Sequence, residues 1–146
     1  MIDGVLITTL SVIDTKGGNV LHGMKYSEQG YSGFGEAYFS FVESGAVKGW
    51  KRHKEMVLNL IVPVGSIHFV LFDDRPNSKS KNQFQEVTLS RNNNYCRLTV
   101  PPKIWIGFQG RDEKSSMLLN IANISHDPKE VDLKDLDSIK YDWRKP

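Results

Sequence analysis

Residues 45–65 read GAVKGWKRHKEMVLNLIVPVG, and this stretch decides the fold. A glycine opens it and another closes it, and the run of residues 56–64, apolar except for Asn59, is typical of a buried strand. Ahead of that run, basic side chains gather around Trp50: Lys48, Lys51, Arg52 and Lys54. If this basic segment is extended, Lys51 and His53 share one face and Arg52 lies on the other, because side chains alternate along a strand.

Short segments with strand character flank this stretch on both sides. Residues 36–42, EAYFSFV, alternate between two faces in the manner of a half-buried strand. Further strands are expected at 1–12, 20–26, 66–73, 84–89, 95–100, 104–109 and 116–124. Ser90 to Asn94 has the composition of a hairpin turn joining two of them. About ten short strands with almost no helical periodicity predict an all-β, antiparallel barrel or sandwich.

Length and composition set further bounds. The 146 residues fit one domain spanning 1–146, and 39% hydrophobic with 25% charged residues is typical of an ordered globular chain. A net charge of +2 gives little reason to expect a nucleic-acid partner, and the local basic cluster suits a phosphate-bearing small molecule equally well. No apolar run approaches the ~20 residues of a membrane helix, so we expect no membrane partner.

The compartment is predicted from two features. Met1-Ile-Asp-Gly has neither a basic segment nor a long apolar run behind it, which argues against a signal peptide. Cys96 is the one cysteine, so it cannot form an internal disulfide. A cytoplasmic location is the simplest expectation for such a chain.

The spacing of residues 45–65 resembles the first motif of the cupins, in which a glycine precedes His-x-His, a glutamate and a second glycine. When the motif is aligned with this stretch, Lys51 occupies the position of the first histidine and His53 that of the second. Leu58 occupies the position of the glutamate. A second cupin motif is matched from Pro101 onward, with Ile106 at its histidine. A metal site needs three or more N, O or S donors, so we expect no metal and no cofactor here.

Within the cupins, residues 13–143 resemble the dTDP-4-dehydrorhamnose 3,5-epimerase family. The matching segments, in order, are GAVKGW (45–50), PVGSIHFVLFDDR (63–75), LTVPPKIWIGF (98–108), DPKE (127–130) and YDW (141–143). The resemblance implies a cupin-type antiparallel β-barrel, or jelly roll, that forms a homodimer. It also implies a metal-free epimerase or isomerase acting on a nucleotide-linked 4-keto-6-deoxyhexose in surface-polysaccharide biosynthesis.

Reactions of this family move a proton from one face of a carbon beside a ketone to the other, which takes a base and an acid. The position of the family's base is occupied here by Lys51. The tyrosine that serves as the family's acid corresponds to Ser125 or His126. The carboxylate that orients the base is expected from the acidic tail, at Asp135 or Asp137. The resemblance thus gives a set of catalytic candidates: His53, Lys51, His126 and Asp135.

Substrate contacts are implied in the same way. Lys48 corresponds to a phosphate-binding arginine, and Lys16 to one that reaches the phosphates across a dimer interface. Arg52 and Trp105 complete the expected binding set, the latter by stacking on a base or sugar.

Three questions stay open at the level of sequence. Lys51 could be a base, an oxyanion stabiliser, a phosphate ligand or a solvated side chain. His53 could be the base, a hydrogen-bond donor to the ketone or a remnant of the cupin frame. The alternative function is a non-catalytic cupin that binds a nucleotide sugar or saccharide, and a third is a ketoisomerase that moves the keto group between C4 and C3.

Overall fold

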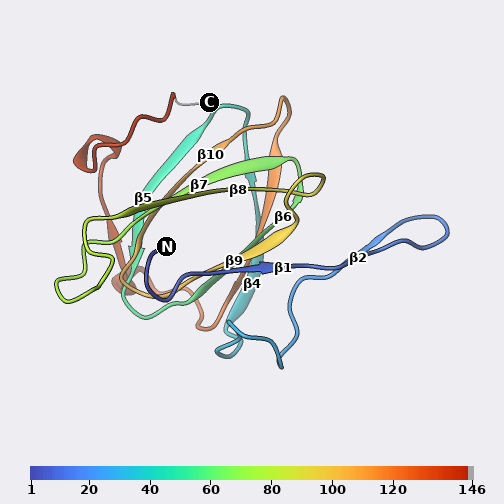
Figure 1. Cartoon of the computed structure of the whole chain (residues 1–146), viewed down its shortest axis with the longest axis horizontal. Helices are drawn as coiled ribbons and strands as arrows, with labels where there is room; N and C mark the ends of the chain where they lie inside the picture. Colours follow the sequence, from blue (N-terminus) through green and yellow to red (C-terminus); the bar gives the residue numbers. More distant parts are fainter. Residues whose placement is uncertain (145–146) are drawn as a thin grey trace.

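The computed structural model describes residues 1–144 as two facing antiparallel sheets with a projecting two-stranded arm (Figure 1). The strands are β1 (Leu6–Thr9), β2 (Val12–Ile13), β3 (Val20–Leu21), β4 (Glu36–Val42), β5 (Val47–His53), β6 (Leu58–Val64), β7 (Ser66–Phe72), β8 (Phe84–Ser90), β9 (Cys96–Val100), β10 (Trp105–Gly110), β11 (Ser116–Ala122) and β12 (Val131–Leu133). One sheet has the order β1-β9-β6-β11-β4 and the other β12-β5-β10-β7-β8. This confirms the predicted all-β, antiparallel cupin-type jelly roll.

The main core lies between the two sheets. Leu60, Leu98 and Leu118 contribute from the first sheet, and Phe69 and Leu71 contribute from the second. All of them are buried, and their strand neighbours point to the opposite faces. The alternation seen in the sequence therefore marks which residues of each strand enter the barrel.

Strand β6 departs from that alternation because both of its faces are covered. Leu58 and Leu60 point into the barrel, whereas Asn59 points outward, where its Nδ2 donates to the Gly30 carbonyl at 3.1 Å. Ile61, on the same outer face, is 1% exposed and lies close to Gly23. The loop before β4 thus covers β6 from outside, which is why Asn59 is the one polar residue in the run at 56–64.

The expected hairpin at 84–100 is wrong. Ser90 and Asn94 do form an isolated antiparallel bridge, so the turn exists. However, β8 pairs with β7 in one sheet, while β9 pairs with β1 and β6 in the other. The chain crosses between sheets at this turn, so that Leu89 of β8 and Leu98 of β9 enter the same core from opposite sheets.

The chain after β11 wraps the outer face of the second sheet. Two short 3-10 helices, η1 (Pro128–Glu130) and η2 (Leu136–Ser138), flank β12. Beyond η2, Ile139 packs with Trp50 and Trp105 in a second apolar cluster, and Trp143 packs against it. Gly107 makes this possible, since a Cβ there would lie 2.9 Å from the Trp143 ring.

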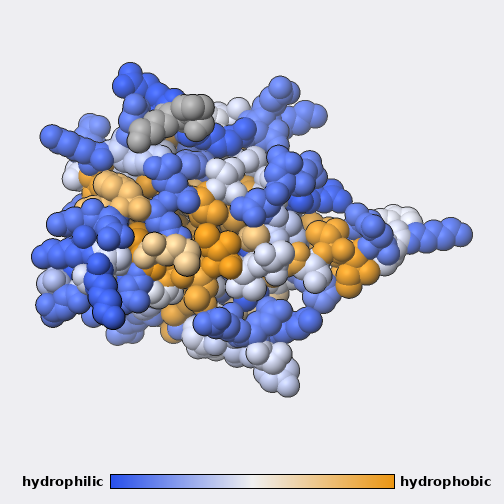
Figure 2. All heavy atoms as spheres, in the orientation of Figure 1, coloured by the Kyte–Doolittle hydropathy of each residue, from blue (hydrophilic) through white to orange (hydrophobic). Residues whose placement is uncertain are grey.

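The arm formed by β2 and β3 extends away from the barrel (Figure 1). Its apolar side chains are exposed, with Val12, Ile13 and Val20 between 41% and 49% accessible. Figure 2 shows hydrophobic surface where the arm leaves the barrel. Among residues 1–144, no helix has the length and apolar character needed to cross a membrane.

Candidate active site

A cavity of about 240 Å³ opens between the two sheets beside β4 and β5. Its apolar walls are Leu58, Leu60, Ile106, Phe108 and Leu118. Its polar groups come from Tyr38, Ser40, Lys48, Lys51, His53 and Asn120. The four positions that the cupin motifs single out, Lys51, His53, Leu58 and Ile106, all line this cavity, so the motif spacing correctly locates it.

Strand geometry explains why Lys51 and His53 point into the same space. Both lie on β5, two residues apart, and alternate with Arg52, which faces outward. Strand β5 lies between β10 and β12, and its register places Lys51 opposite Ile106 on β10 and opposite Leu133 on β12. Gly49, at a φ of 151°, lets β5 approach β10 closely, since a Cβ there would lie 2.8 Å from the Gly107 Cα.

His53 is the buried titratable group of the cavity and is 6% exposed. Its Nδ1 atom contacts the Oε1 atom of Glu130, a carboxylate that is itself 7% exposed. A carboxylate at Nδ1 fixes the orientation of the ring and leaves Nε2 as the nitrogen for chemistry in the cavity. The pair has the arrangement of an oriented general base.

The position of Glu130 follows from its local sequence. Asp127 caps η1, with its carboxylate accepting from the Lys129 N–H at 2.9 Å, and Pro128 is suited to the first helical position. The helix ends directly at β12, where Val131 lies opposite His53. The turn therefore delivers Glu130 to the end of β5, beside the histidine.

Several hydrogen bonds hold the Glu130 carboxylate in its charged form. Its Oε2 atom accepts from three successive backbone N–H groups, those of Lys54, Glu55 and Met56, at 3.1 to 3.2 Å. Burial alone would raise the pKa of Glu130, but the hydrogen bonds from His53 and from the backbone outweigh it, so the pKa lies below its ordinary value. A charged, fixed carboxylate stabilises the imidazolium that forms when His53 takes up a proton.

The two lysines of the cavity lie along the same strand as His53. The Lys48 ammonium donates to the Phe41 carbonyl at 3.3 Å, which holds it near the turn between β4 and β5. Lys51 lies between Lys48 and His53 along β5 and also borders a second groove outside the cavity. The exposed ammonium groups give the cavity a cationic side suited to an anionic ligand.

Arg52 and Trp105 lie on the outer face of the second sheet and do not line the cavity. The Arg52 guanidinium pairs with Asp74 at 3.0 Å and with Asp132 at 2.9 Å, and it lies 4.5 Å from the centre of the Trp105 ring. The indole Nε1 of Trp105 donates to Asp74 at 2.8 Å. The structure thus places both expected binding residues in a network outside the cavity that joins β5, β10, β12 and the loop after β7, with the Trp105 ring itself buried.

The remaining candidates also lie apart from the cavity. His126 is exposed in the loop before η1, and Lys16 lies near the tip of the β2–β3 arm. Asp135 borders the outer groove together with Lys51 and Lys134, and Asp137 borders a hollow along the C-terminal segment. The carboxylate that contacts His53 is that of Glu130. The expectation that Asp135 or Asp137 orients a base at Lys51 stays a prediction.

Two further polar residues of the cavity were not singled out as catalytic candidates. Asn120 and Tyr38 lie opposite each other on β11 and β4, and the Asn120 Nδ2 donates to the Tyr38 hydroxyl at 3.1 Å. The alternation of residues 36–42 contained the signal, since it puts Tyr38 and Ser40 on one face. For Glu130, the signal was the Asp-Pro-Lys-Glu turn, which directs its last residue inward.

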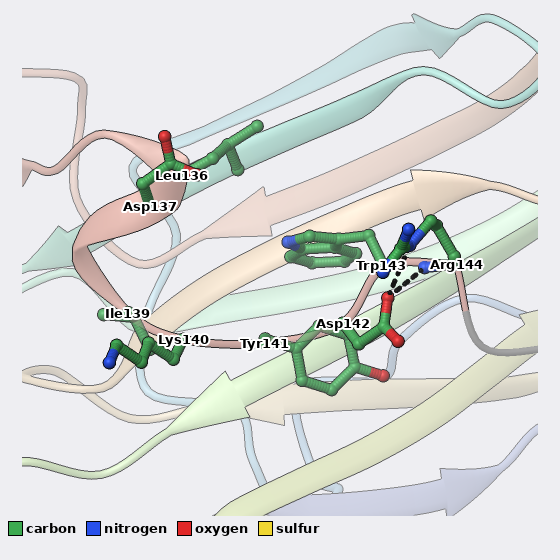
Figure 3. A pocket seen from close by; sticks show the side chains of 8 residues that line it. All are labelled: Leu136, Asp137, Ile139, Lys140, Tyr141, Asp142, Trp143 and Arg144. Carbon is green, nitrogen blue, oxygen red and sulfur yellow. Dashed lines mark hydrogen bonds and ion pairs between the residues drawn. The ribbon is translucent and has the colours of Figure 1, made fainter.

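A larger hollow of about 630 Å³ lies along residues 136–144 (Figure 3). All of its lining residues come from this one segment, and Figure 3 shows the Asp142 carboxylate turned toward the Arg144 guanidinium, 3.2 Å away. None of the described residues that line the barrel cavity belongs to it. It is a feature of the tail packing and contributes no group to the cavity.

Comparison with known proteins agrees with this geometry. No protein-family model matches the chain. A solved structure of a dTDP sugar isomerase from Desulfovibrio desulfuricans G20 superimposes with a TM-score of 0.94 at 37% identity, covering 97% of this chain and 92% of that one. A dTDP-4-dehydrorhamnose 3,5-epimerase from Elizabethkingia anophelis NUHP1 has the same fold, with a TM-score of 0.82 at 17% identity, covering 99% and 84% of the two chains.

One curated relative comes from an archaeon. It is a probable low-salt glycan biosynthesis epimerase of Haloferax volcanii, 28% identical over 97 residues, or 66% of this chain. The match spans 62% of that relative's length. Taken with the fold and the near full-length 37% match, these similarities show that the chain belongs to the dTDP-4-dehydrorhamnose 3,5-epimerase-like family of cupin sugar-nucleotide epimerases and isomerases.

Proposed function

We propose that this protein is a sugar-nucleotide epimerase or isomerase that acts on a nucleotide-linked 4-keto-6-deoxyhexose. The observation that carries the proposal is the contact between His53 and Glu130 within a cavity that Lys48 and Lys51 also line. The names of the relatives, a dTDP sugar isomerase and a glycan biosynthesis epimerase, support the same substrate class and a role in surface-polysaccharide biosynthesis.

The proposed chemistry follows from the placement of these groups. The His53 Nε2 removes a proton from the carbon beside the ketone, while Glu130 stabilises the imidazolium. Lys51 lies next along the strand and stabilises the negative oxygen of the enolate that results. A cavity of about 240 Å³ is smaller than the pockets that enclose drug-sized ligands, so it holds the sugar and leaves the diphosphate at the mouth, near Lys48.

The decisive experiment is incubation with dTDP-4-keto-6-deoxyglucose in deuterated water, followed by NMR of the sugar. Deuterium at C3 or C5 is the expected result, and it should disappear in His53→Gln. The matched control is His22→Gln, because His22 lies outside the described cavity. Tight binding without exchange would support the non-catalytic alternative, and a product with its ketone at C3 without exchange at C5 would identify a ketoisomerase. Failure to bind any sugar nucleotide would rule out the epimerase, the ketoisomerase and a binder of nucleotide sugars.

We also propose a homodimer. Phe39 and Phe41 are each 62% exposed on the outer side of β4, where they alternate with the cavity residues Tyr38 and Ser40. Exposed aromatic pairs on a sheet face are typical of protein interfaces. The exposed apolar arm is a second contact surface, and its Lys16 would then reach the phosphate end of a substrate in the partner subunit.

For the compartment we propose the cytoplasm. Cys96 is buried and unpaired, which suits a reducing environment. The substrate class that we propose is charged and linked to a nucleotide, and it would be made and used on the same side of the membrane.

A further inference from the structure

The hydrogen bond between Asn120 and Tyr38 has a direction that matters for the chemistry of the cavity. Asn120 is 2% exposed, and its Oδ1 accepts from the backbone N–H of Asn59 at 3.2 Å. This contact fixes the orientation of the amide, because a backbone N–H needs an acceptor. The Asn120 Nδ2 must therefore face the Tyr38 hydroxyl, 3.1 Å away, and donate to it.

An amide nitrogen cannot accept a hydrogen bond, so the Tyr38 oxygen is the acceptor in this pair. The phenolic hydrogen is then directed elsewhere, and the side chain lines the cavity. Tyr38 is 43% exposed because β4 is the last strand of its sheet. Asn120 thus holds Tyr38 with its proton free for a ligand in the cavity.

Tyr38 and His53 come from opposite sheets. Tyr38 lies on β4 of the first sheet, and His53 lies on β5 of the second. A sugar ring between them has a base on one side and a proton donor on the other. His126 and Ser125, the positions at which the family's acid was expected, are exposed and do not line the cavity.

We propose that Tyr38 is the catalytic acid of this protein and that Asn120 is its positioning residue. The inference rests on the proposed function. The His53 Nε2 takes the proton from the carbon beside the ketone, and the C–H electron pair forms the enolate double bond while the carbonyl pair moves to oxygen. Tyr38 then protonates that carbon from the opposite face, the ketone re-forms, and the phenolate regains a proton from solvent as His53 loses its own. The sequence has no net oxidation or reduction.

The test separates proton removal from proton return. In deuterated water, Tyr38→Phe should still place deuterium on the carbon in its original configuration, because His53 removes the proton and the imidazolium returns deuterium to the same face. Formation of the inverted or isomerised product should fall at least 100-fold with KM changed less than threefold. His53→Gln should lose both signals. Tyr26→Phe is the matched control, since Tyr26 is 84% exposed and lies outside the cavity.

A second variant tests the positioning role without removing the phenol. Asn120→Asp keeps the size of the side chain, but a carboxylate oxygen in place of Nδ2 accepts from Tyr38 and draws its proton away from the cavity. Product formation by Asn120→Asp should fall while deuterium exchange persists. Asn120→Gln should also be slower than wild type, because its longer side chain cannot hydrogen-bond to both the Asn59 N–H and the Tyr38 hydroxyl.

The outcomes are distinguishable. Product formation by Tyr38→Phe within threefold of wild type would overturn the inference and leave the proposed function intact. Joint loss of exchange, product formation and dTDP binding in both Tyr38→Phe and Asn120→Asp would show a structural role and also overturn it. Absence of exchange and product in the wild-type protein would remove the proposed function itself, and the inference with it.

Discussion

Glu130 contacts the Nδ1 atom of His53 across 77 residues of sequence, and this one contact fixes the orientation of a strand histidine that lines the cavity. The Glu130 carboxylate thereby joins η1 to the end of β5. Its Oε2 also receives three backbone N–H groups at the end of β5. One side chain therefore serves both the reactivity of His53 and the shape of the strand end.

Replacing Glu130 with glutamine should separate these two contributions. Glutamine keeps an oxygen for the backbone N–H groups but cannot stabilise an imidazolium, so we expect kcat to fall at least tenfold with little change in KM. Glu130→Ala should in addition lower the free energy of unfolding by about 2 kcal/mol, because backbone donors lose their acceptor. Steady-state kinetics and urea unfolding measure the two effects, and an unchanged kcat in Glu130→Gln would show that His53 needs no carboxylate.

Lys48 should contribute to the binding of the diphosphate. Lys48→Met is expected to weaken dTDP binding about tenfold, which corresponds to about 1.4 kcal/mol. The contribution should shrink as ionic strength rises, because the ammonium group is exposed and screened by salt. Isothermal titration at two salt concentrations measures this, with the exposed Lys81→Met as the control. Equal affinities for Lys48→Met and wild type would place the diphosphate elsewhere.

Lys51 should act on the rate more than on binding. We expect Lys51→Met to lower kcat more than tenfold while dTDP binds within about threefold of wild type, because the group faces the ketone in the proposed reaction. Lys51→His discriminates further: it raises turnover if the position has decayed from a histidine base, and it abolishes turnover if the ammonium is the working group.

Asp73 should make the free energy of unfolding depend on pH in the acidic range. The side chain is fully buried and accepts hydrogen bonds from Arg75 at 2.9 Å and from Ser78 and Ser80 at 2.6 Å. Burial alone would raise the pKa of Asp73, but these hydrogen bonds outweigh it and hold the pKa well below its usual range. The carboxylate therefore stabilises the folded state above the unfolded-state pKa of about 4, and this stability is lost as pH falls through the lowered folded-state pKa.

The corresponding variant is Asp73→Asn. We expect it to lower the free energy of unfolding at pH 7 by about 3 kcal/mol, since the partly exposed Arg75 guanidinium loses its buried, charged partner. Its stability should also change less than that of wild type between pH 5 and about pH 3. Chemical denaturation across that range measures both quantities, and Asp14→Asn, at an exposed position of the arm, is the control. Parallel pH curves for Asp73→Asn and wild type would contradict the assignment.

The proposed dimer should depend on the outer face of β4. Phe39→Ser combined with Phe41→Ser is expected to convert a dimer to a monomer in light scattering, while the exposed Tyr26→Ser leaves the mass unchanged. A monomeric wild-type protein would refute the proposal directly. Retention of the dimer in the double variant would move the interface to another surface, such as the arm.

The fold class could be predicted because the sequence patterns that identify the strands are local. Alternation in residues 36–42 and the spacing within 45–65 identify strands and the faces they bury, and both patterns survive in the structure. The hairpin at 84–100 failed because a turn sequence shows where the chain reverses and gives no sign of which strand each arm will pair with. That choice is made by ladders between distant segments, such as β8 with β7 and β9 with β6.

The site was predictable in part for the same reason. His53 and Lys51 were placed together because they share a strand, and strand periodicity is visible in sequence. Glu130 was missed because its role depends on where η1 meets the end of β5, a contact between segments 77 residues apart. Tyr38 was not singled out as a catalytic candidate, since nothing in its own segment reveals that Asn120 lies opposite and donates to it.

The late position of β12 also affects how the protein matures as it is made. Strand β5 leaves the ribosome before β12, the strand that completes its edge, and before Glu130, which contacts His53 and lies 77 residues later in the sequence. A nascent chain halted before residue 130 can pair β5 with β10 and still lack the carboxylate that orients His53. The pair of His53 and Glu130 therefore forms only after most strands of the barrel have been made.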